Sequence, residues 1–283
     1  MPEFLSAAID IAREAGQLLE NFARQKISYE LKGDYDLVTQ ADHASERLVI
    51  ERLQAAFPDH AIVAEETGGV SLESDYRWYV DPLDGTTNFA HGYPMYNVTL
   101  ALERCGELIA GVIFDPHNQE LFAAERGGGA FLNGQRIYVS KVDKIQASLF
   151  STGFPSHRRH KSINIHFYYQ LAMASHGVRR GGSAGLDLAY VACGRLDGFW
   201  EFGLKPWDMA AGILLVQEAG GACSDMLGGA ASVHGPHILA DNGLIHHEVL
   251  ELFAEIFAGR FRFPLPEIRS PGPSLGPKVG DAK

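Results

Sequence analysis

Residues 78–89 read Trp-Tyr-Val-Asp-Pro-Leu-Asp-Gly-Thr-Thr-Asn-Phe. Asp81 and Asp84 stand three residues apart around a proline that fixes the turn, so both carboxylates can face one small space. Gly85 has no Cβ and lets backbone approach a ligand closely. Hard cations such as Mg²⁺ bind carboxylate and carbonyl oxygens, and N–H groups at a helix start bind phosphate. The segment predicts a metal and phosphate site, although a capped turn with solvated acids also carries this short motif.

The regions on either side of this segment predict a chain of mixed helices and strands. Helical spacing of apolar residues predicts helices at 3–24, 40–57, 161–174, 183–192, 208–219 and 244–257. Short apolar runs predict strands at 61–64, 78–80, 149–152, 196–201, 222–224 and 238–240, with an antiparallel meander between 98 and 131. Thr39 is the candidate N-cap of the second helix. The fold class is therefore α/β, or α+β, built in layers.

Composition limits the classes of protein that the chain can belong to. The chain has 283 residues, 46% of them apolar, which is enough for a sizeable core. A net charge of −11 argues against a protein that coats nucleic acid or an anionic membrane. The N-terminus lacks a signal segment, and no apolar run approaches the roughly 20 residues that span a bilayer. Three widely spaced cysteines suit a reduced, cytoplasmic protein.

The sequence shows no flexible linker before its C-terminal segment, so two fused halves are expected. We expect an N-terminal α+β half at 1–145, which carries the metal and phosphate motif, and a C-terminal α/β half at 146–262, which carries the substrate-selecting residues. The remaining segment, 263–283, is rich in proline and glycine with few large apolar side chains. It is expected to be a disordered tail, because it cannot offset the entropy of ordering.

Four segments resemble the inositol monophosphatase family. Residues 78–89 match its first signature, and Trp207-Asp208 followed by 218–221, Glu-Ala-Gly-Gly, resembles its second. Segments 36–42 and 64–68 are also similar, and the resemblance extends over about residues 4–258. It implies the layered α/β/α/β/α sandwich of the sugar phosphatases, lithium inhibition and a homodimer. It also implies Mg²⁺-dependent hydrolysis of inositol monophosphate, a phosphate monoester, to inositol and phosphate.

The resemblance also implies a set of metal ligands. Glu65, Asp81 and the carbonyl of Leu83 would hold the first Mg²⁺, and Asp81, Asp84 and Asp208 the second. Asp42 would hold a third ion or order its water, so two or three ions are expected. Converging carboxylates repel one another unless cations neutralise them, which agrees with this set. Two ordinary alternatives stay open: Asp208 as a helix N-cap, and Asp42 as an exposed acid in a first helical turn.

Catalytic and substrate-binding roles follow from the same resemblance. Glu65, helped by the hydroxyl of Thr86 and the metal-bound Asp81, would orient and deprotonate the attacking water. The expected phosphate and substrate contacts are Gly85, Thr86, Thr87, Gly182, Ser183, Ala184, Glu201 and Asp208. Glu201 would accept hydrogen bonds from polyol hydroxyls, or else be a surface acid at a strand end. Two positions depart from the family pattern: Gly185 replaces an alanine, and Asn97 a small apolar residue.

Residues 182–198 look like the bacterial inositol monophosphatase branch and unlike the 3′-phosphoadenosine nucleotidase branch. Fructose-1,6-bisphosphatase or 3′-phosphonucleotide phosphatase activity stays open as an alternative. So does a regulatory binding protein associated with RNA processing or transcription, which the basic clusters at 158–161 and 179–180 would serve. These clusters, and the scattered histidines, otherwise fit an ordinary solvated surface.

Overall fold

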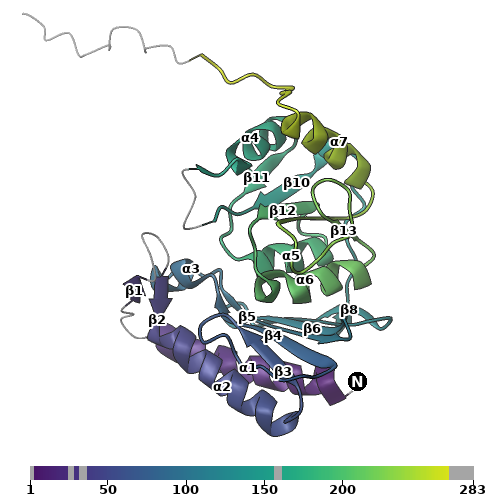
Figure 1. Ribbon diagram of the computed structural model, residues 1–283. Helices are drawn as coiled ribbons and strands as arrows, with labels where there is room; N and C mark the ends of the chain where they lie inside the picture. The colour runs from purple at the N-terminus through teal and green to yellow at the C-terminus, as the bar shows by residue number, and fades with distance from the viewer. Residues whose placement is uncertain (1–2, 25–28, 32–36, 156–160, 268–283) are drawn as a thin grey trace, which may run out of the picture.

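The computed structural model describes residues 3–24, 29–31, 37–155 and 161–267 (Figure 1). Its helices are α1 (Glu3–Ala23), α2 (Gln40–Ala56), α3 (Thr86–Ala90), α4 (Asn164–Ala174), α5 (Ala184–Ala192), α6 (Pro206–Glu218) and α7 (His246–Phe257), with a 3₁₀ turn η1 (Ile145–Ala147). Its strands are β1 (Tyr29–Leu31), β2 (Leu37–Thr39), β3 (Ala61–Ala64), β4 (Tyr76–Asp84), β5 (Asn97–Arg104), β6 (Glu107–Asp115), β7 (Glu120–Glu125), β8 (Gly129–Leu132), β9 (Gln135–Arg136), β10 (Leu149–Thr152), β11 (Gly177–Arg179), β12 (Gly198–Phe202), β13 (Ala222–Ser224) and β14 (His237–Asp241). Asp36, His157, the basic residues 158–160 and the tail from residue 268 lie outside the described residues.

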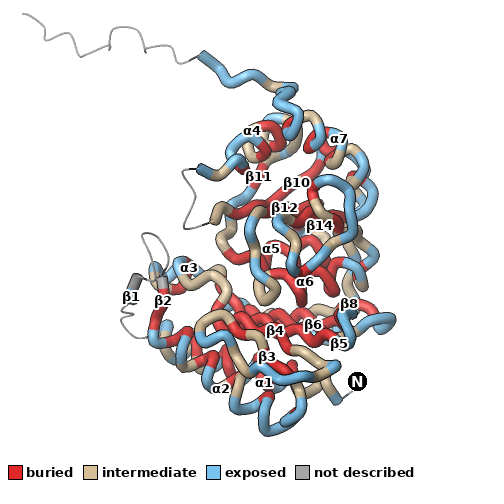
Figure 2. The backbone as a smooth tube through the Cα atoms, in the orientation of Figure 1, coloured by how far each residue is buried: buried red, intermediate tan, exposed pale blue. Residues whose placement is uncertain are grey.

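The elements stack in five layers, which confirms the predicted α/β/α/β/α sandwich. Helices α1 and α2 cover one face of the large sheet, α5 and α6 lie between the two sheets, and α4 and α7 cover the outer face of the second sheet (Figure 1). Three apolar cores lie between these layers and pack them together. Most of the buried residues belong to these cores (Figure 2). The middle core joins Tyr79 and Phe122 of the large sheet to Leu214 of α6. The two sheets are therefore fixed relative to each other by shared packing.

The larger sheet has seven strands in the order β3-β4-β5-β6-β7-β8-β9. Strands β3 and β4 pair in parallel, and all later neighbours pair antiparallel, as the predicted meander requires. Because β3 and β4 are parallel, their carboxyl ends lie at the same edge of the sheet. Glu65, directly after β3, and Asp81, near the end of β4, are thereby brought close together.

The smaller sheet has five strands in the order β11-β10-β12-β14-β13. Strand β10 runs parallel to both β11 and β12, whereas β14 is antiparallel to its two neighbours. The carboxyl ends of β10, β11 and β12 therefore share one edge. These ends lead to Gly153, Arg180 and the loop before α6.

Local sequence explains several element boundaries, and two of the differences from prediction concern the site. Helix α2 starts after Thr39, whose hydroxyl accepts the N–H of Ala41 while its own N–H donates to Asp42 (2.7 Å). Strand β4 was predicted at 78–80 but runs from Tyr76 to Asp84, with a register shift where Pro82 lacks an N–H. Helix α6 starts two residues earlier than predicted, because a proline at its first position is favourable. Asp208 is therefore the third residue of that helix and not its N-cap.

Helices in the described segments are too short or too polar for a bilayer crossing. The three cysteines are free thiols: Cys105 is exposed, and Cys193 and Cys223 are partly buried.

Candidate active site

Both sheets contribute carboxylates to one open cavity of about 390 Å³. Glu65 and Asp84 reach its wall from the ends of β3 and β4. Glu201 of β12 and Asp208 of α6 reach it from the opposite side. The structure thus brings together four predicted site residues that lie up to 143 positions apart in the chain (208 − 65).

Asp81 is not among the residues that line the cavity and is only 2% exposed. Its Oδ1 accepts the backbone N–H of Leu83 (3.0 Å). Burial raises the pKa of Asp81 well above its ordinary value, and repulsion from the carboxylates of Glu65, Asp84 and Asp208 raises it further. Four carboxylates therefore share one electrostatic environment, and a cation at this place would relieve their repulsion.

Three donors hold the carboxylate of Asp84 through one oxygen, Oδ2. They are the side-chain amide of Asn97 (2.8 Å), the hydroxyl of Ser183 (2.7 Å) and the backbone N–H of Gly185 (2.7 Å). Burial raises the pKa of Asp84, whereas these hydrogen bonds oppose that rise. Asp84 therefore keeps a fixed orientation, and it couples β4 to the start of α5.

Asp42 is buried completely, so the alternative of an exposed first-turn acid is wrong. Its Oδ2 accepts hydrogen bonds from the N–H and the hydroxyl of Thr39, and its Oδ1 accepts the hydroxyl of Thr86 (3.0 Å). The same Thr86 hydroxyl lies 3.1 Å from the carbonyl oxygen of Leu83. Asp42 thus both caps α2 and holds a predicted catalytic hydroxyl in place.

Helix α3 begins directly after Gly85, as a phosphate-binding turn would require. Gly85 has φ +91°, and a Cβ there would lie 2.7 Å from the carbonyl oxygen of Met95, so only glycine fits. Thr86 is half-buried and Thr87 is exposed. Gly85, Thr86 and Thr87 do not belong to the cavity wall described above, whereas Gly182, Ser183 and Ala184 do.

Glu201 is 8% exposed, so the alternative of a surface acid at a strand end is wrong. Burial raises its pKa well above the ordinary value; Asp187, Asp208 and Asp84 add to that rise, and Arg180 opposes it. Burial likewise raises the pKa of Asp187 to about 8. Gly153 makes room for Glu201, because a Cβ at 153 would overlap both carboxylate oxygens.

Carboxylate oxygens and a backbone carbonyl are the ligands that Mg²⁺ prefers, so the residues present fit a hard cation in kind. Across residues 3–24, 29–31, 37–155 and 161–267, no three His, Cys, Asp or Glu side chains enclose a metal position by themselves. Water and substrate phosphate would have to complete the coordination, which is the usual manner of Mg²⁺ binding.

Several residues at the site carried no motif signal. Glu46 is 1% exposed and accepts the N–H groups of Glu66 (2.7 Å) and Thr67 (2.9 Å), which fixes the turn that carries Glu65. The sequence did contain a weak signal for Glu46. Asp42, Ser45 and Glu46 are polar residues at helical positions that face the core, on the same stripe as the apolar Val49. Arg180 lines the cavity, although the sequence suggested a solvated basic cluster or a contact with a macromolecular partner.

Comparison with known proteins agrees with this arrangement. The model of the inositol monophosphatase family matches residues 1–258. An inositol-1-monophosphatase of Mesorhizobium japonicum is 44% identical over 261 residues, covering 90% of this chain and 98% of that protein. A protein of Pseudomonas aeruginosa named Nus factor SuhB is 45% identical over 252 residues, covering 86% and 92%.

Solved structures show the same fold. The extragenic suppressor protein suhB of Bartonella henselae superimposes with a TM-score of 0.85 at 40% identity, covering 89% of this chain and 98% of that one. The inositol monophosphatase of Anabaena gives a TM-score of 0.80 at 40% identity, covering 88% and 94%. The fold and the family match together define the class of protein as a phosphatase that acts on phosphate monoesters. The chain belongs to the inositol monophosphatase family, whose members generally depend on Mg²⁺.

Proposed function

We propose that the protein is an inositol-1-monophosphatase that hydrolyses inositol monophosphate in the presence of Mg²⁺. One observation carries the proposal: Glu201 meets Asp84 and Asp208 across a single cavity. A carboxylate accepts hydrogen bonds from several hydroxyls at once, and a polyol ring supplies them. The Mesorhizobium and Anabaena relatives that bear this activity in their names support the same substrate class.

The metal ligands proposed are those that the family resemblance implies. Glu65, Asp81 and the Leu83 carbonyl would hold one Mg²⁺, and Asp81, Asp84 and Asp208 would hold a second, with water and substrate phosphate completing the coordination. Asp42, which accepts the Thr86 hydroxyl, would hold a third ion or order its water. When bound, Mg²⁺ activates water, screens the phosphate charge and stabilises the leaving alkoxide.

Side chains of the protein supply position and proton transfer. Glu65 orients the attacking water and accepts its proton, while the Thr86 hydroxyl, held by Asp42, fixes the water in line with phosphorus. Backbone N–H groups at Gly85, Thr86 and Thr87 bind the phosphate oxygens. The substrate ring is bordered by Gly182, Ser183 and Ala184. Glu201 accepts hydrogen bonds from the hydroxyl groups of that ring.

A comparison of substrates tests this proposal. Values of kcat/KM would be measured with Mg²⁺ for inositol 1-phosphate, fructose 1,6-bisphosphate and 3′-phosphoadenosine 5′-phosphate, in the wild type and in Glu201→Gln. We expect inositol 1-phosphate to be preferred, and Glu201→Gln to lose most of that preference. A preference for either rival substrate would replace the proposed activity with fructose-1,6-bisphosphatase or 3′-phosphonucleotide phosphatase.

The remaining properties of the proposal follow the family. We propose a cytoplasmic homodimer inhibited by lithium, with the metal motif in the half at 1–145, substrate selection in the half at 146–262 and a tail at 263–283. Phe263 and Pro264, at the start of that tail, still bond to Gln170 and Tyr169 of α4.

A second candidate function is regulatory binding to the RNA-processing or transcription machinery. The observation that favours it is the 45% identity to the protein named Nus factor SuhB. A deletion strain would be complemented with the wild type and with Asp84→Asn. Rescue by the inactive Asp84→Asn variant would support the binding role, whereas failure to rescue would support the enzyme.

A further inference from the structure

Asn97 lies at the first strand position of β5, completely buried, and its side chain contacts a proposed metal ligand. Its amide nitrogen, Nδ2, lies 2.8 Å from Oδ2 of Asp84 and 2.9 Å from the hydroxyl oxygen of Ser183. The Ser183 hydroxyl in turn donates to the same Asp84 oxygen (2.7 Å). One amide therefore reaches the carboxylate both directly and through a second side chain.

The orientation of the Asn97 amide is fixed by the Asp84 carboxylate, which can only accept, and Thr99 completes the arrangement at the other end of the amide. Thr99, two residues along β5 and buried, donates its hydroxyl to Oδ1 of Asn97 (2.6 Å). If the amide were flipped, its oxygen would face the carboxylate of Asp84, and two acceptors would stand in contact. In this series of hydrogen bonds, Thr99 therefore donates to Asn97, and Asn97 donates to Asp84.

Gly185 provides the space that Asn97 occupies. A Cβ at residue 185 would lie 3.0 Å from Oδ1 of Asn97, 2.9 Å from the Thr99 hydroxyl oxygen and 3.0 Å from Oδ2 of Asp84. These distances are tighter than ordinary Cβ contacts, so an alanine at 185 would push against the polar cluster. The two positions that depart from the family pattern, Asn97 and Gly185, are therefore one feature and not two independent changes.

We propose that Asn97 is a positioning residue: with Gly185 as its required neighbour, it holds the Asp84 carboxylate in the orientation that binds Mg²⁺. This inference rests on the proposed function, because it deepens the role of Asp84. Hydrogen bonds to a charged group are stronger than those between neutral groups. Loss of the amide removes one side-chain donor and leaves the Asp84 carboxylate held by Ser183 and by the backbone N–H groups of Ala184 and Gly185, and therefore freer to rotate.

The test compares Mg²⁺ binding among variants without using turnover. Mg²⁺ binding to the folded protein would be followed by isothermal titration calorimetry at fixed inorganic phosphate, and the midpoint is the Mg²⁺ concentration at half saturation. We expect Asn97→Ala to raise this midpoint about tenfold. The matched control is Asn242→Ala, which removes a buried amide that binds Ser140 and Val142 outside the cavity wall.

Two further comparisons separate positioning from loss of packing. Thr99→Ser keeps the hydroxyl and should keep the wild-type Mg²⁺ midpoint, whereas Thr99→Val removes it and should raise the midpoint. Gly185→Ala should raise it as well, because its Cβ would press on Asn97, Thr99 and Asp84. In the double variant Asn97→Ala/Gly185→Ala the combined effect should be smaller than the product of the two single effects, because removal of the Asn97 amide relieves part of the clash. In steady-state kinetics, kcat at fixed Mg²⁺ should fall while KM for the phosphate monoester stays within about twofold.

The inference is overturned if Asn97→Ala shifts the Mg²⁺ midpoint no more than Asn242→Ala does, or if the effects of Asn97→Ala and Gly185→Ala multiply. It is also overturned if the wild type shows no binding of Mg²⁺ in the same titration. A wild type that binds Mg²⁺ but does not hydrolyse inositol 1-phosphate would contradict the proposed function alone, and the midpoints would still decide the role of Asn97.

Discussion

Thr86 donates its hydroxyl to Oδ1 of the buried Asp42 across 3.0 Å, which joins the start of α3 to the first turn of α2. Asp42 cannot turn away, because its other oxygen already accepts two hydrogen bonds from Thr39. The orientation of Thr86 is therefore set by a helix cap 44 residues earlier in the chain.

The first prediction concerns this hydroxyl. Thr86→Val keeps the shape of the side chain but removes its hydrogen bonds, so kcat should fall about 100-fold, the scale of a lost acid–base contribution. Thr86→Ser retains the hydroxyl and should stay within about tenfold of the wild type, since it loses packing only. Steady-state kinetics with saturating Mg²⁺ measures both. If kcat falls equally in Thr86→Val and Thr86→Ser, the hydroxyl has no role in catalysis.

The second prediction concerns the turn that carries Glu65. Glu46→Gln replaces one of the two acceptor oxygens with an amide, so an N–H of Glu66 or Thr67 loses its partner. The loss should lower kcat about tenfold with little change in KM, because the turn loosens around Glu65. Glu51→Gln, at an exposed site on the same helix, is the control and should be neutral. A KM effect without a kcat effect would contradict the assigned role.

The third prediction is a pH dependence of stability. His60 stacks on Tyr76 (4.5 Å between ring centroids), and its Nδ1 accepts the indole N–H of Trp78 (3.1 Å). Burial lowers the pKa of His60, with Asp59 opposing the shift slightly. The unfolded chain therefore binds more protons near and below pH 6.5, and the free energy of unfolding falls as pH drops through that range.

Denaturant unfolding at pH 7.5 and pH 5.5 checks this prediction. His60→Phe removes the titrating group and should lose less stability between the two pH values than the wild type does. His117→Phe, at an exposed histidine, should keep the wild-type difference. If His60→Phe and the wild type lose the same stability, the pH dependence arises elsewhere.

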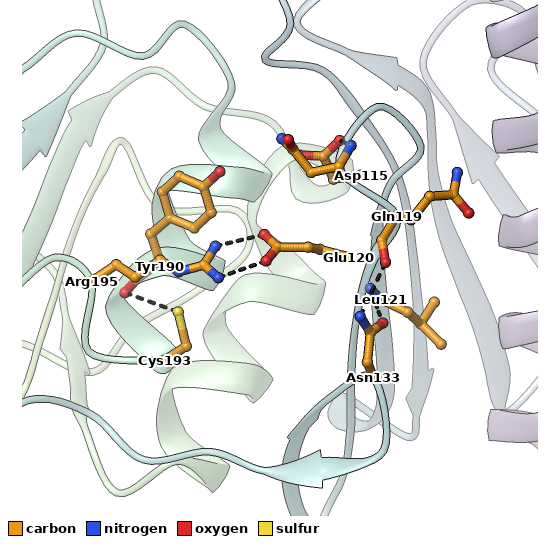
Figure 3. A network of polar contacts seen from close by, with 9 residues as sticks. Asp115, Gln119, Glu120, Leu121, Asn133, Tyr190, Cys193 and Arg195 are labelled. Carbon is orange, nitrogen blue, oxygen red and sulfur yellow. Dashed lines mark hydrogen bonds and ion pairs between the residues drawn. The ribbon is translucent and has the colours of Figure 1, made fainter.

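The fourth prediction concerns an ion pair between layers. Both terminal nitrogens of Arg195 lie 2.6 Å from the carboxylate oxygens of Glu120, and its guanidinium lies 5.1 Å from the Tyr190 ring (Figure 3). This pair connects β7 of the large sheet to the loop after α5. Arg195→Lys keeps the charge but loses the two-point contact, and should cost about 1 kcal/mol, or about 2–4 °C in Tm.

A second two-point pair provides the control. Arg262 bonds to Glu255 only seven residues away (2.7 and 2.9 Å), so it crosses no layer boundary. Arg262→Lys should therefore change Tm less than Arg195→Lys, because a local pair constrains a shorter length of chain. Calorimetry on both variants decides between them, and equal shifts would show that the Arg195 pair does not hold the layers together.

Much of the fold was predictable because local signals agree with the tertiary structure. The apolar stripe of α1 and the capping residues of α2 place those helices within a residue of prediction. Strand β11 was missed, because a three-residue strand of Gly-Val-Arg has no periodicity to detect. Strand β4 was cut short because a proline normally ends a strand, whereas here a bulge accommodates it.

The site was predictable where chemistry follows from a contiguous motif, as at Asp81 and Asp84. It was not predictable where a residue acts through space. Asn97 contacts Ser183, 86 positions further on, and nothing in its own surroundings predicts that contact. Arg180 was assigned to a solvated cluster because sequence cannot tell which of two adjacent arginines turns toward a cavity.

The most direct measurement is phosphate release from inositol 1-phosphate, with and without Mg²⁺, by the wild type and by Asp84→Asn. Asp84→Asn keeps the size of the side chain but removes the charge that the cavity presents to a cation. We predict rapid release by the wild type only with Mg²⁺, and at least a 100-fold lower kcat for Asp84→Asn even at saturating Mg²⁺. Full activity of Asp84→Asn, or release that does not depend on Mg²⁺, would contradict the proposed function.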